Sequence, residues 1–343
     1  MVTFKLDKKS RTPYYTQLVE QFELAAKKDQ LMAGDILPSM NALAEQLGLS
    51  KETVKKTYSI LRDRGLVESH HGKGFYVSEK SRGKYLRVLV ISDVNSIYKQ
   101  ILLGAFQDRL SERGDCDTTV LLHNQDVNIL RYYLDRNLDH YDWFVVFPHF
   151  PLDEKTQKEV RRQLKRIPNR RLILLDRWTK DLPGNYGAVY QDFDNDAFDA
   201  LVAHFDAIKS KGRLNVMTLN SLYKDSIQDS IRRFAQQYGI ETVFNTGEQQ
   251  DIQPGDICIL LSSQHDNGLV SLAKRIEKHK LSIGRDVFII CYNDFPLNEL
   301  VFGGLSTMST DFAKMGESAA DMILSGKLRK LHNPFSLIRR KTF

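Results

Sequence analysis

Cysteine is scarce in this sequence of 343 residues, which holds only Cys116, Cys258 and Cys291. The three lie far apart and show no metal-ligand spacing, which disfavours a disulfide scaffold or a zinc site and is typical of a reducing cytoplasm. No apolar run approaches 18 residues, so we expect no membrane span, and the first residues have no apolar signal core. Apolar residues make up 42% and charged residues 27% of the chain, a balance typical of globular proteins.

Catalytic motifs are also missing. No Gly-x-Gly-x-x-Gly lies between a strand and a helix, and the nine histidines show neither a His-Glu-x-x-His pattern nor a cysteine partner. The acidic cluster Asp192, Asp194, Asp196 and Asp199 lacks the glycine and glutamate of a calcium loop, and it better fits the acidic start of a helix over 194–209. We therefore expect no catalytic residue, no metal and no cofactor.

The net charge of +6 is distributed unevenly along the chain. Residues 1–87 hold 16 basic and 10 acidic side chains, whereas residues 88–326 hold 27 basic and 33 acidic ones. Residues 327–343 hold six basic side chains and no acidic one. A basic N-terminal part on an acidic body indicates that the first part meets a polyanion.

The N-terminal part has the pattern of a winged helix-turn-helix. An amphipathic helix begins at Pro13, a short helix over 40–47 ends at Gly48, and a further helix runs from Ser50 to about residue 64. Two helices joined by a short turn containing glycine are typical of helix-turn-helix geometry. Strands over 66–69 and 75–77, joined by a glycine-containing tip, form the predicted wing.

From residue 86 onward, apolar runs alternate with amphipathic segments. This order predicts parallel strands with crossover helices, in one large sheet or two smaller ones. The predicted strands cover 86–91, 143–147, 172–175, 214–219, 257–261 and 287–291. The predicted helices cover 99–113, 153–166, 194–209, 225–238 and 267–280. The expected domains are a winged helix over 1–78, a polar linker over 79–85 and a two-lobed domain over 86–343.

Several N-terminal motifs carry a family resemblance. The motifs are Gly34-Asp-Ile-Leu-Pro-Ser39, Leu43-Ala-Glu-Gln-Leu-Gly-Leu-Ser50, Gly65-Leu-Val-Glu68 and Gly72-Lys-Gly-Phe-Tyr-Val77. In order and spacing they resemble the winged-helix domain of GntR-family bacterial repressors. Lys51 and Lys55 share one face of the predicted recognition helix and can donate to guanine, and Lys73 at the wing tip can reach an adjacent groove. The candidate DNA-binding residues are Ser39, Asn41, Ser50, Lys51, Thr53, Lys55, His71, Gly72 and Lys73.

The body resembles a second family, the two-lobed sugar-binding domain of LacI-type repressors. The resemblance rests on Asn95-Ser-Ile-Tyr98, Leu175-Asp-Arg177, His265-Asp266, Tyr292-Asn-Asp294 and Leu305-Ser-Thr307. A GntR-type head on a LacI-type body is the arrangement of arabinose-responsive repressors. The implied fold class is α/β, with an N-terminal winged helix-turn-helix and a parallel-sheet, periplasmic-binding-protein-like (type I) effector domain.

The polar residues that follow the predicted strands form the candidate effector site, because ligands of open α/β sheets bind beyond the carboxyl ends of the strands. Where LacI-type repressors have an arginine that clamps sugar hydroxyls, this chain has Ile227. Either Lys224 or Gln228 compensates, or the ligand differs. The candidate effector-binding residues are Asn95, Tyr98, Asp176, Arg177, Trp178, Lys224, His265, Asp266, Asn293 and Asp294.

The resemblances together predict a cytoplasmic, homodimeric transcription regulator that acts as a repressor. Its expected partners are double-stranded operator DNA and a pentose, deoxyhexose or related sugar. Two alternatives remain open. One is a DNA-binding protein controlled by a protein partner, with a vestigial cleft, and the other is a sugar-processing enzyme tethered to DNA.

Overall fold

A computed structural model describes residues 4–8, 10, 12–27, 30–70, 74–78, 86–114, 116–179, 181–218, 222–246, 251–261 and 267–343. The chain divides into two compact units. The first consists of Met1–Arg87, Arg113–Asp117 and Arg136–Asp142, and the second of Val88–Glu112, Thr118–Asp135 and Trp143–Phe343. None of the helices in the described ranges is long and apolar enough to cross a membrane.

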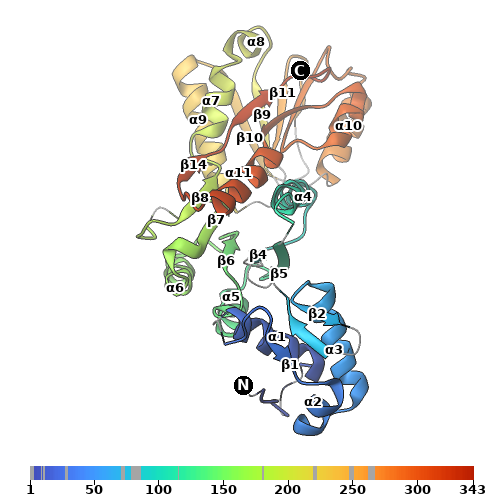
Figure 1. Cartoon of the computed structure of the whole chain (residues 1–343). Helices are drawn as coiled ribbons and strands as arrows, with labels where there is room; N and C mark the ends of the chain where they lie inside the picture. Colours follow the sequence, from blue (N-terminus) through green and yellow to red (C-terminus); the bar gives the residue numbers. More distant parts are fainter. Residues whose placement is uncertain are drawn as a thin grey trace. The chain divides into compact units, whose positions relative to one another are not determined.

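The N-terminal head contains the three predicted helices and the predicted hairpin (Figure 1). Its elements are α1 (Tyr14–Lys27), α2 (Met40–Leu47), α3 (Lys51–Asp63), β1 (Ile36–Leu37), β2 (Val67–His70) and β3 (Gly74–Val77). The three strands form an antiparallel sheet in the order β1-β3-β2. β1 was not predicted, because two residues are too few to show an alternating pattern.

Local interactions explain where α2 and α3 begin and end. The Ser39 hydroxyl accepts a hydrogen bond from the backbone N–H of Ala42 at 3.1 Å, and the Ser50 hydroxyl accepts one from Thr53 at 3.2 Å. Each serine therefore caps the first turn of its helix. Gly48 ends α2 with a φ of 64°, a left-handed conformation that glycine adopts without steric cost.

The apolar faces of the head helices meet in one core. Phe22 of α1 packs edge-on against Tyr58 of α3, with 5.9 Å between ring centroids. The Tyr58 hydroxyl donates to the carbonyl oxygen of Pro38 at 2.6 Å, so this buried polar group keeps a partner. Because Val54 and Leu61 are also fully buried, α3 is fixed with its opposite face outward.

Two lobes, each built on a six-stranded sheet, make up the body (Figure 1). In lobe 1 the strand order is β14-β8-β7-β6-β4-β5, with parallel pairing from β14 to β4. Its strands are β4 (Leu86–Ser92), β5 (Cys116–Leu122), β6 (Trp143–Val146), β7 (Leu172–Asp176), β8 (Gly187–Tyr190) and β14 (Lys330–His332). The predicted α/β architecture with parallel sheets is confirmed, in its two-sheet form.

Lobe 2 repeats this plan. Its strand order is β10-β9-β11-β12-β13-β15, parallel as far as β13, with β15 antiparallel. Its strands are β9 (Leu214–Thr218), β10 (Thr242–Thr246), β11 (Ile257–Leu261), β12 (Phe288–Tyr292), β13 (Ser306–Thr310) and β15 (Phe335–Ile338). The sheet orders require the chain to pass between the lobes after β8, after β13 and after β14.

Helices cover both faces of the lobe 2 sheet (Figure 1). α7 (Asp196–Val202), α8 (Phe205–Lys209) and α9 (Lys224–Tyr238) pack on one face, and α10 (Asn267–Lys278) packs on the other. Side chains alternate accordingly, since Val216 packs with the first group and Met217 with α10. In the structure, the single helix predicted over 194–209 is divided into α7 and α8.

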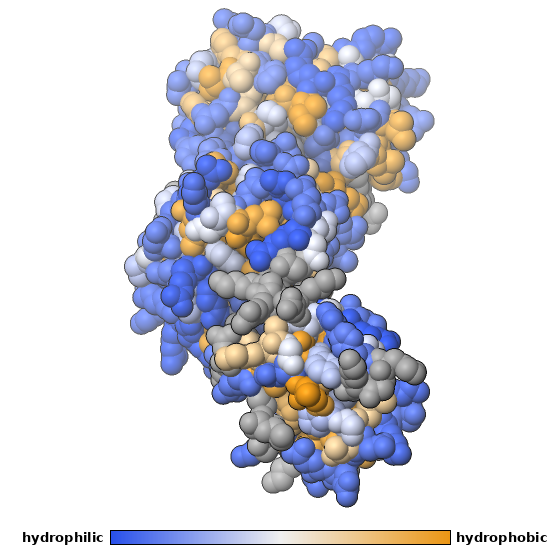
Figure 2. All heavy atoms as spheres, viewed as in Figure 1, coloured by the Kyte–Doolittle hydropathy of each residue, from blue (hydrophilic) through white to orange (hydrophobic). Residues whose placement is uncertain are grey.

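In lobe 1, α4 (Ile97–Ser111) and α11 (Phe312–Ser325) lie side by side although they are far apart in the sequence (Figure 1). A Cβ atom at Gly316 would lie 2.2 Å from the carbonyl oxygen of Leu102, so only glycine allows this approach. The remaining helices of this lobe are α5 (Val127–Asn137) and α6 (Glu154–Leu164). The visible face of the molecule is mostly hydrophilic, with hydrophobic residues in small separate patches (Figure 2).

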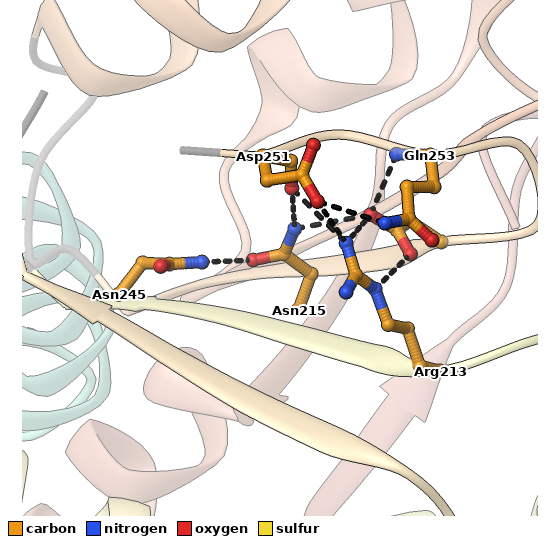
Figure 3. A network of polar contacts seen from close by, with 6 residues as sticks. Arg213, Asn215, Asn245, Asp251 and Gln253 are labelled. Carbon is orange, nitrogen blue, oxygen red and sulfur yellow. Dashed lines mark hydrogen bonds and ion pairs between the residues drawn. The ribbon is translucent and has the colours of Figure 1, made fainter. Parts of the chain in front are cut away.

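A buried polar network joins the amino ends of β9 and β11 (Figure 3). Arg213 Nε donates to Asp256 Oδ1 at 2.7 Å, and Asn215 Nδ2 donates to Asp256 Oδ2 at 3.1 Å. Asn245 of β10 donates in turn to the side-chain oxygen of Asn215 at 2.6 Å. Asp256 is only 1% exposed, so the network supplies the partners that a buried carboxylate needs.

Candidate functional site

The outward face of α3 carries exposed cationic side chains. Lys51 and Lys55 are exposed, and Lys55 Nζ lies 3.8 Å from Glu52 Oε1, a pair that water screens strongly. Asn41, at the start of α2, is exposed as well. The hydroxyls of Ser39 and Ser50 cap the N-termini of α2 and α3. Backbone N–H groups at a helix N-terminus attract anions such as phosphate.

Thr53 and the wing complete the predicted DNA-binding set. Thr53 Oγ1 lies 2.8 Å from Ser50 Oγ, so the two hydroxyls share a hydrogen bond. His71, Gly72 and Lys73 lie outside the described residues. The strands on either side of them are paired, with His70 opposite Gly74. The assignment of these residues to DNA contacts remains a prediction.

A cavity of about 390 Å³ lies between the two lobes of the body. Its size is within the range of small-molecule sites in proteins. It opens where strands of both sheets reach their carboxyl ends, the position at which open α/β sheets bind ligands. The lining residues are Asp93, Val94, Ser96, Tyr98, Gln125, His149, Asp176, Gln191, Phe193, Leu222, Tyr223, Lys224, Ile227, Leu261, Tyr292 and Asn293.

Asp176 is the centre of the polar side of this cavity. Its Oδ2 accepts hydrogen bonds from His149 Nε2 at 2.9 Å and from the Tyr98 hydroxyl at 3.3 Å. Its Oδ1 accepts one from Gln191 Nε2 at 2.5 Å. Burial alone would raise the pKa of Asp176, but His149, the nearby Lys99 ammonium and Gln191 outweigh that effect and hold the pKa below its usual range.

A hydrogen bond connects the lobes at this point. Tyr223 directly precedes α9 of lobe 2, and its hydroxyl lies 2.6 Å from Nδ1 of His149 in lobe 1. Because a carboxylate only accepts, His149 carries a proton on Nε2, and its Nδ1 accepts from Tyr223 when the ring is neutral. Asp176, His149 and Tyr223 thus form one chain of hydrogen bonds that spans the two lobes.

Backbone strain marks two of the strand ends at the cavity. Asp176, the last residue of β7, has a φ of 69°, and Asn293, which follows β12, has a φ of 70°. Residues other than glycine reach this left-handed region at a cost of about 1–3 kcal/mol, and such strain is concentrated at functional sites. Both residues line the cavity.

The structure brings together part of the predicted effector site. Tyr98, Asp176, Lys224 and Asn293 line the cavity, and so does Ile227, which stands where the LacI-type pattern has arginine. His265 and Asp266 lie outside the described residues.

Four other predicted residues are not among the residues that line the cavity. Asn95 accepts from Gln100, the Arg177 guanidinium donates to the carbonyl oxygen of Pro148, and the Trp178 indole donates to Tyr186. The Asp294 carboxylate forms a two-point ion pair with Arg340, at 2.9 and 2.8 Å.

Sequence reasoning missed His149, Gln191, Tyr223 and Tyr292. His149 and Tyr292 could have been found, because each lies at the end of a predicted strand. Gln191 follows β8, a strand that was not predicted, and Tyr223 belongs to the start of a helix. Gln191 donates to Asp176 within lobe 1, whereas Tyr223 meets His149 only because the lobes face each other.

The acidic cluster begins a helix as predicted, because Asp196 and Asp199 lie in the first turn of α7, and Asp196 has a second role. Asp196 is 2% exposed, and its carboxylate accepts from His332 Nε2 at 2.6 Å and from the backbone N–H of Asp192 at 2.8 Å. Burial raises the pKa of Asp196 to about 6, an effect that the attraction of His332 only partly offsets. Since α7 belongs to lobe 2 and β14 to lobe 1, this contact also spans the lobes.

The raised pKa predicts how stability changes with pH. A carboxyl group whose pKa is higher in the folded state stabilises the fold below its unfolded value of 3.8, and this stabilisation disappears as the pH rises through about 6. Asp196→Asn should therefore raise the free energy of unfolding at pH 8 by about 1–3 kcal/mol and leave it unchanged near pH 3. Urea unfolding between pH 3 and 8 measures the effect, with Asp199→Asn as control because Asp199 is exposed on the same helix. Equal stability of Asp196→Asn and the unsubstituted protein at pH 8 would contradict it.

Family models match the two ends of the chain. Residues 15–77 match the model of bacterial regulatory proteins of the gntR family, and residues 213–342 match that of the periplasmic binding protein-like domain. The HTH-type transcriptional repressor YtrA of Bacillus subtilis is 35% identical over 78 residues. That alignment spans 23% of this chain and 60% of YtrA, less than two thirds of the relative.

Solved structures resemble the body. The dimeric Lac repressor with an 11-residue C-terminal deletion has a TM-score of 0.59 at 15% identity, covering 75% of this chain and 98% of that chain. A LacI family transcriptional regulator from Lactobacillus casei with bound glucose has a TM-score of 0.57 at 16% identity, covering 75% and 99%. At these identities the likeness shows the fold. The predicted combination of a GntR-type head and a LacI-like, periplasmic-binding-protein-like body is confirmed.

Proposed function

We propose that this chain, which joins a gntR-family winged helix to a two-lobed body of LacI-like fold, is a cytoplasmic, homodimeric transcriptional repressor controlled by a small carbohydrate. The observation that carries the proposal is the presence, in one chain, of an exposed cationic recognition helix and a cavity of about 390 Å³ between two lobes. The first is a means of binding DNA, and the second is a means of sensing a ligand.

The DNA-binding part rests on α3. The second helix of a helix-turn-helix enters the major groove with its N-terminal residues near the base edges. Lys51 and Lys55 lie four residues apart, in the first turns of α3, and both side chains are exposed. We assign them to base edges and phosphates, and we assign Ser39, Asn41 and the wing residues 71–73 to the DNA backbone.

The ligand-sensing part rests on the polar side of the cavity. Three residues that line it carry a buried polar atom with no hydrogen-bond partner within the described structure: Ser96 Oγ, Gln191 Oε1 and the Tyr292 hydroxyl. Each belongs to a residue that is more than nine-tenths buried, so each lacks the water that would otherwise satisfy it. A ligand with several hydroxyl groups would supply these missing hydrogen bonds. The glucose bound to a regulator of similar fold supports a sugar as that ligand.

Control of DNA binding would act through lobe closure. A ligand shifts an equilibrium only by its differential affinity for the two states. The hydrogen bond between His149 and Tyr223 and the ion pair between Asp196 and His332 both cross between the lobes, so a change in closure must alter them. In a dimer, the resulting rotation would change the spacing of the two heads over their half-sites.

Selection of duplexes from a random pool by the full chain tests the proposal. The selected sequence should be a palindrome with half-sites about one helical turn apart or a multiple of it. A sugar that stabilises the protein should then change its affinity for that duplex by about 5-fold to 150-fold. If no sequence is enriched, the DNA-binding part of the proposal is contradicted. If no stabilising sugar changes the affinity of the protein for the selected duplex, control by a ligand is contradicted.

A further inference from the structure

Basic side chains gather in one short segment of the acidic body. Residues 153–171, which contain α6 and the turn Asn169–Arg171, hold eight basic and three acidic side chains. The remainder of residues 88–326 holds 19 basic and 30 acidic ones. The segment is therefore a local positive region on a part of the chain that is otherwise negative, and its field attracts anions.

Four of these cations form a row along the outer face of α6, which lies on the outside of lobe 1 (Figure 1). We call them the basic row: Lys155, Lys158, Arg162 and Lys165, all exposed. Their spacings of three, four and three residues place them on one side of a helix, over a length of about 15 Å. The opposite side of α6 is buried, at Gln157, Val160, Gln163 and Leu164.

The stability of α6 does not account for the basic row. Basic side chains favour the C-terminal end of a helix, but Lys155 and Lys158 lie in the N-terminal half of α6, where the helix dipole disfavours them. Within the described part of the chain, Lys155, Lys158 and Lys165 have no carboxylate within 4.0 Å. Arg162 lies 3.4 Å from Glu159, and 78% of its side chain is exposed. The row is therefore open to an anionic partner.

The composition of the basic row favours a nucleic acid over a protein as that partner. The buried centres of protein interfaces are depleted in lysine and enriched in aromatic residues, whereas the row holds three lysines and no aromatic residue. Duplex DNA carries one negative charge for about every 1.7 Å of its axis, so it offers a linear array of phosphates to a linear array of cations. Because the proposed function brings a duplex to the head, DNA is present on the same molecule at high effective concentration.

We propose that the basic row binds the phosphate backbone of DNA that flanks the operator, an inference that rests on the proposed function. Contacts with phosphates carry no sequence information, so the row adds affinity without adding sequence preference. The operator complex then depends on DNA outside the two half-sites as well as on the bases that the heads read.

Salt titrations of the full chain with two duplexes test the proposal. One duplex is the operator selected from the random pool, and the other adds about two helical turns of scrambled sequence on each side. The flanked duplex should bind about 10-fold to 100-fold more tightly at low salt, because each phosphate contact releases a counterion. The logarithm of its binding constant should also fall more steeply with the logarithm of the salt concentration, by about 0.9 for each cation that meets a phosphate.

Two quadruple variants separate the basic row from the general charge of the body. The first combines Lys155→Gln, Lys158→Gln, Arg162→Gln and Lys165→Gln. It should lose the gain from the flanks and keep the affinity for the unflanked operator. The second removes the same charge from four exposed lysines elsewhere in the body, and it should keep the gain. It combines Lys209→Gln, Lys274→Gln, Lys278→Gln and Lys327→Gln. Glutamine favours helices about as well as lysine, and thermal unfolding followed by circular dichroism checks that both variants fold.

The outcomes separate this proposal from the proposed function. If the flanked duplex binds no more tightly than the unflanked operator, the proposal is overturned and sequence-specific binding by the heads still holds. A gain that persists in the first variant, or that disappears equally in both, would overturn it as well. Selection of no operator by the full chain would overturn the proposed function and the role of the basic row together.

Discussion

Replacing Lys51 with alanine is expected to reduce the preference of this protein for its operator over unrelated DNA by about 2–6 kcal/mol. A side chain that donates to a base edge contributes about 1–3 kcal/mol of discrimination, and the proposed homodimer would use it once in each half-site. Lys51 is exposed in the first turn of α3, the position from which a recognition helix meets the bases. Titration of the selected operator and of a scrambled duplex of equal length, both at one salt concentration, measures the effect.

Lys56→Ala is the matched control for that experiment. It removes the same charge from the same helix, but Lys56 Nζ packs over the Tyr15 ring at 3.7 Å from the centroid. It should weaken binding to operator and scrambled duplex alike, with a smaller dependence on salt, because its field acts on phosphates of every sequence. If Lys51→Ala preserved discrimination and Lys56→Ala reduced it, the register of the recognition helix would be wrong.

Replacing Asp256 with alanine is expected to reduce the free energy of unfolding of the body by about 3–5 kcal/mol. Asp256 is 1% exposed and accepts hydrogen bonds from Arg213, Asn215 and the backbone N–H of Gln253. Removing one partner of a buried ion pair leaves the other charge and its neighbours without compensation, which costs this much in proteins. Urea unfolding followed by circular dichroism gives the value.

Asp251→Ala provides the comparison within the same network (Figure 3). The Asp251 side chain is 74% exposed, and its carboxylate lies 3.4 Å from Arg213 Nη2. Because water screens this pair, its loss should cost less than about 1 kcal/mol. Equal effects of the two substitutions would contradict the expectation that burial of the Asp256 carboxylate sets the cost.

The head could be predicted almost completely from the sequence. Its helices are delimited by residues that act on their own backbone, such as the caps Ser39 and Ser50 and the left-handed Gly48, and these signals are local. The strands with continuous apolar runs were found in both lobes for a similar reason, because a buried parallel strand needs no context to be apolar.

β13 shows why other elements could not be predicted. Four of its five residues are serine or threonine, yet all five are buried between β12 and β15. Their hydroxyls have partners that come from distant parts of the chain, as when Thr310 Oγ1 donates to the carbonyl oxygen of Pro334 and Ser306 Oγ accepts from the backbone N–H of Arg340. A polar segment can be a buried strand only when such partners exist, and no local pattern reveals them.

Only some of the residues that line the cavity could be predicted, because contacts with distant parts of the chain decide the positions of the others. Asp176 and Asn293 were expected, since polar residues directly after apolar strands lie at the ligand-binding edge of the sheet. Asp294 was expected on equal grounds, but a bidentate pair with Arg340 engages its carboxylate. Alternation along the chain sends neighbouring side chains to opposite sides, and only the fold decides which of two adjacent acids faces the ligand.

The sequence by itself determined the winged head, the alternating α/β body and the uneven distribution of charge, because caps, turns, periodicity and composition act over a few residues. The tertiary structure alone decided that His149 of one lobe meets Tyr223 of the other at 2.6 Å, and that polar and apolar side chains from separate strands line one cavity. These features depend on contacts between residues far apart in the chain. They exist only once two separately formed sheets are brought together by three crossings of the chain.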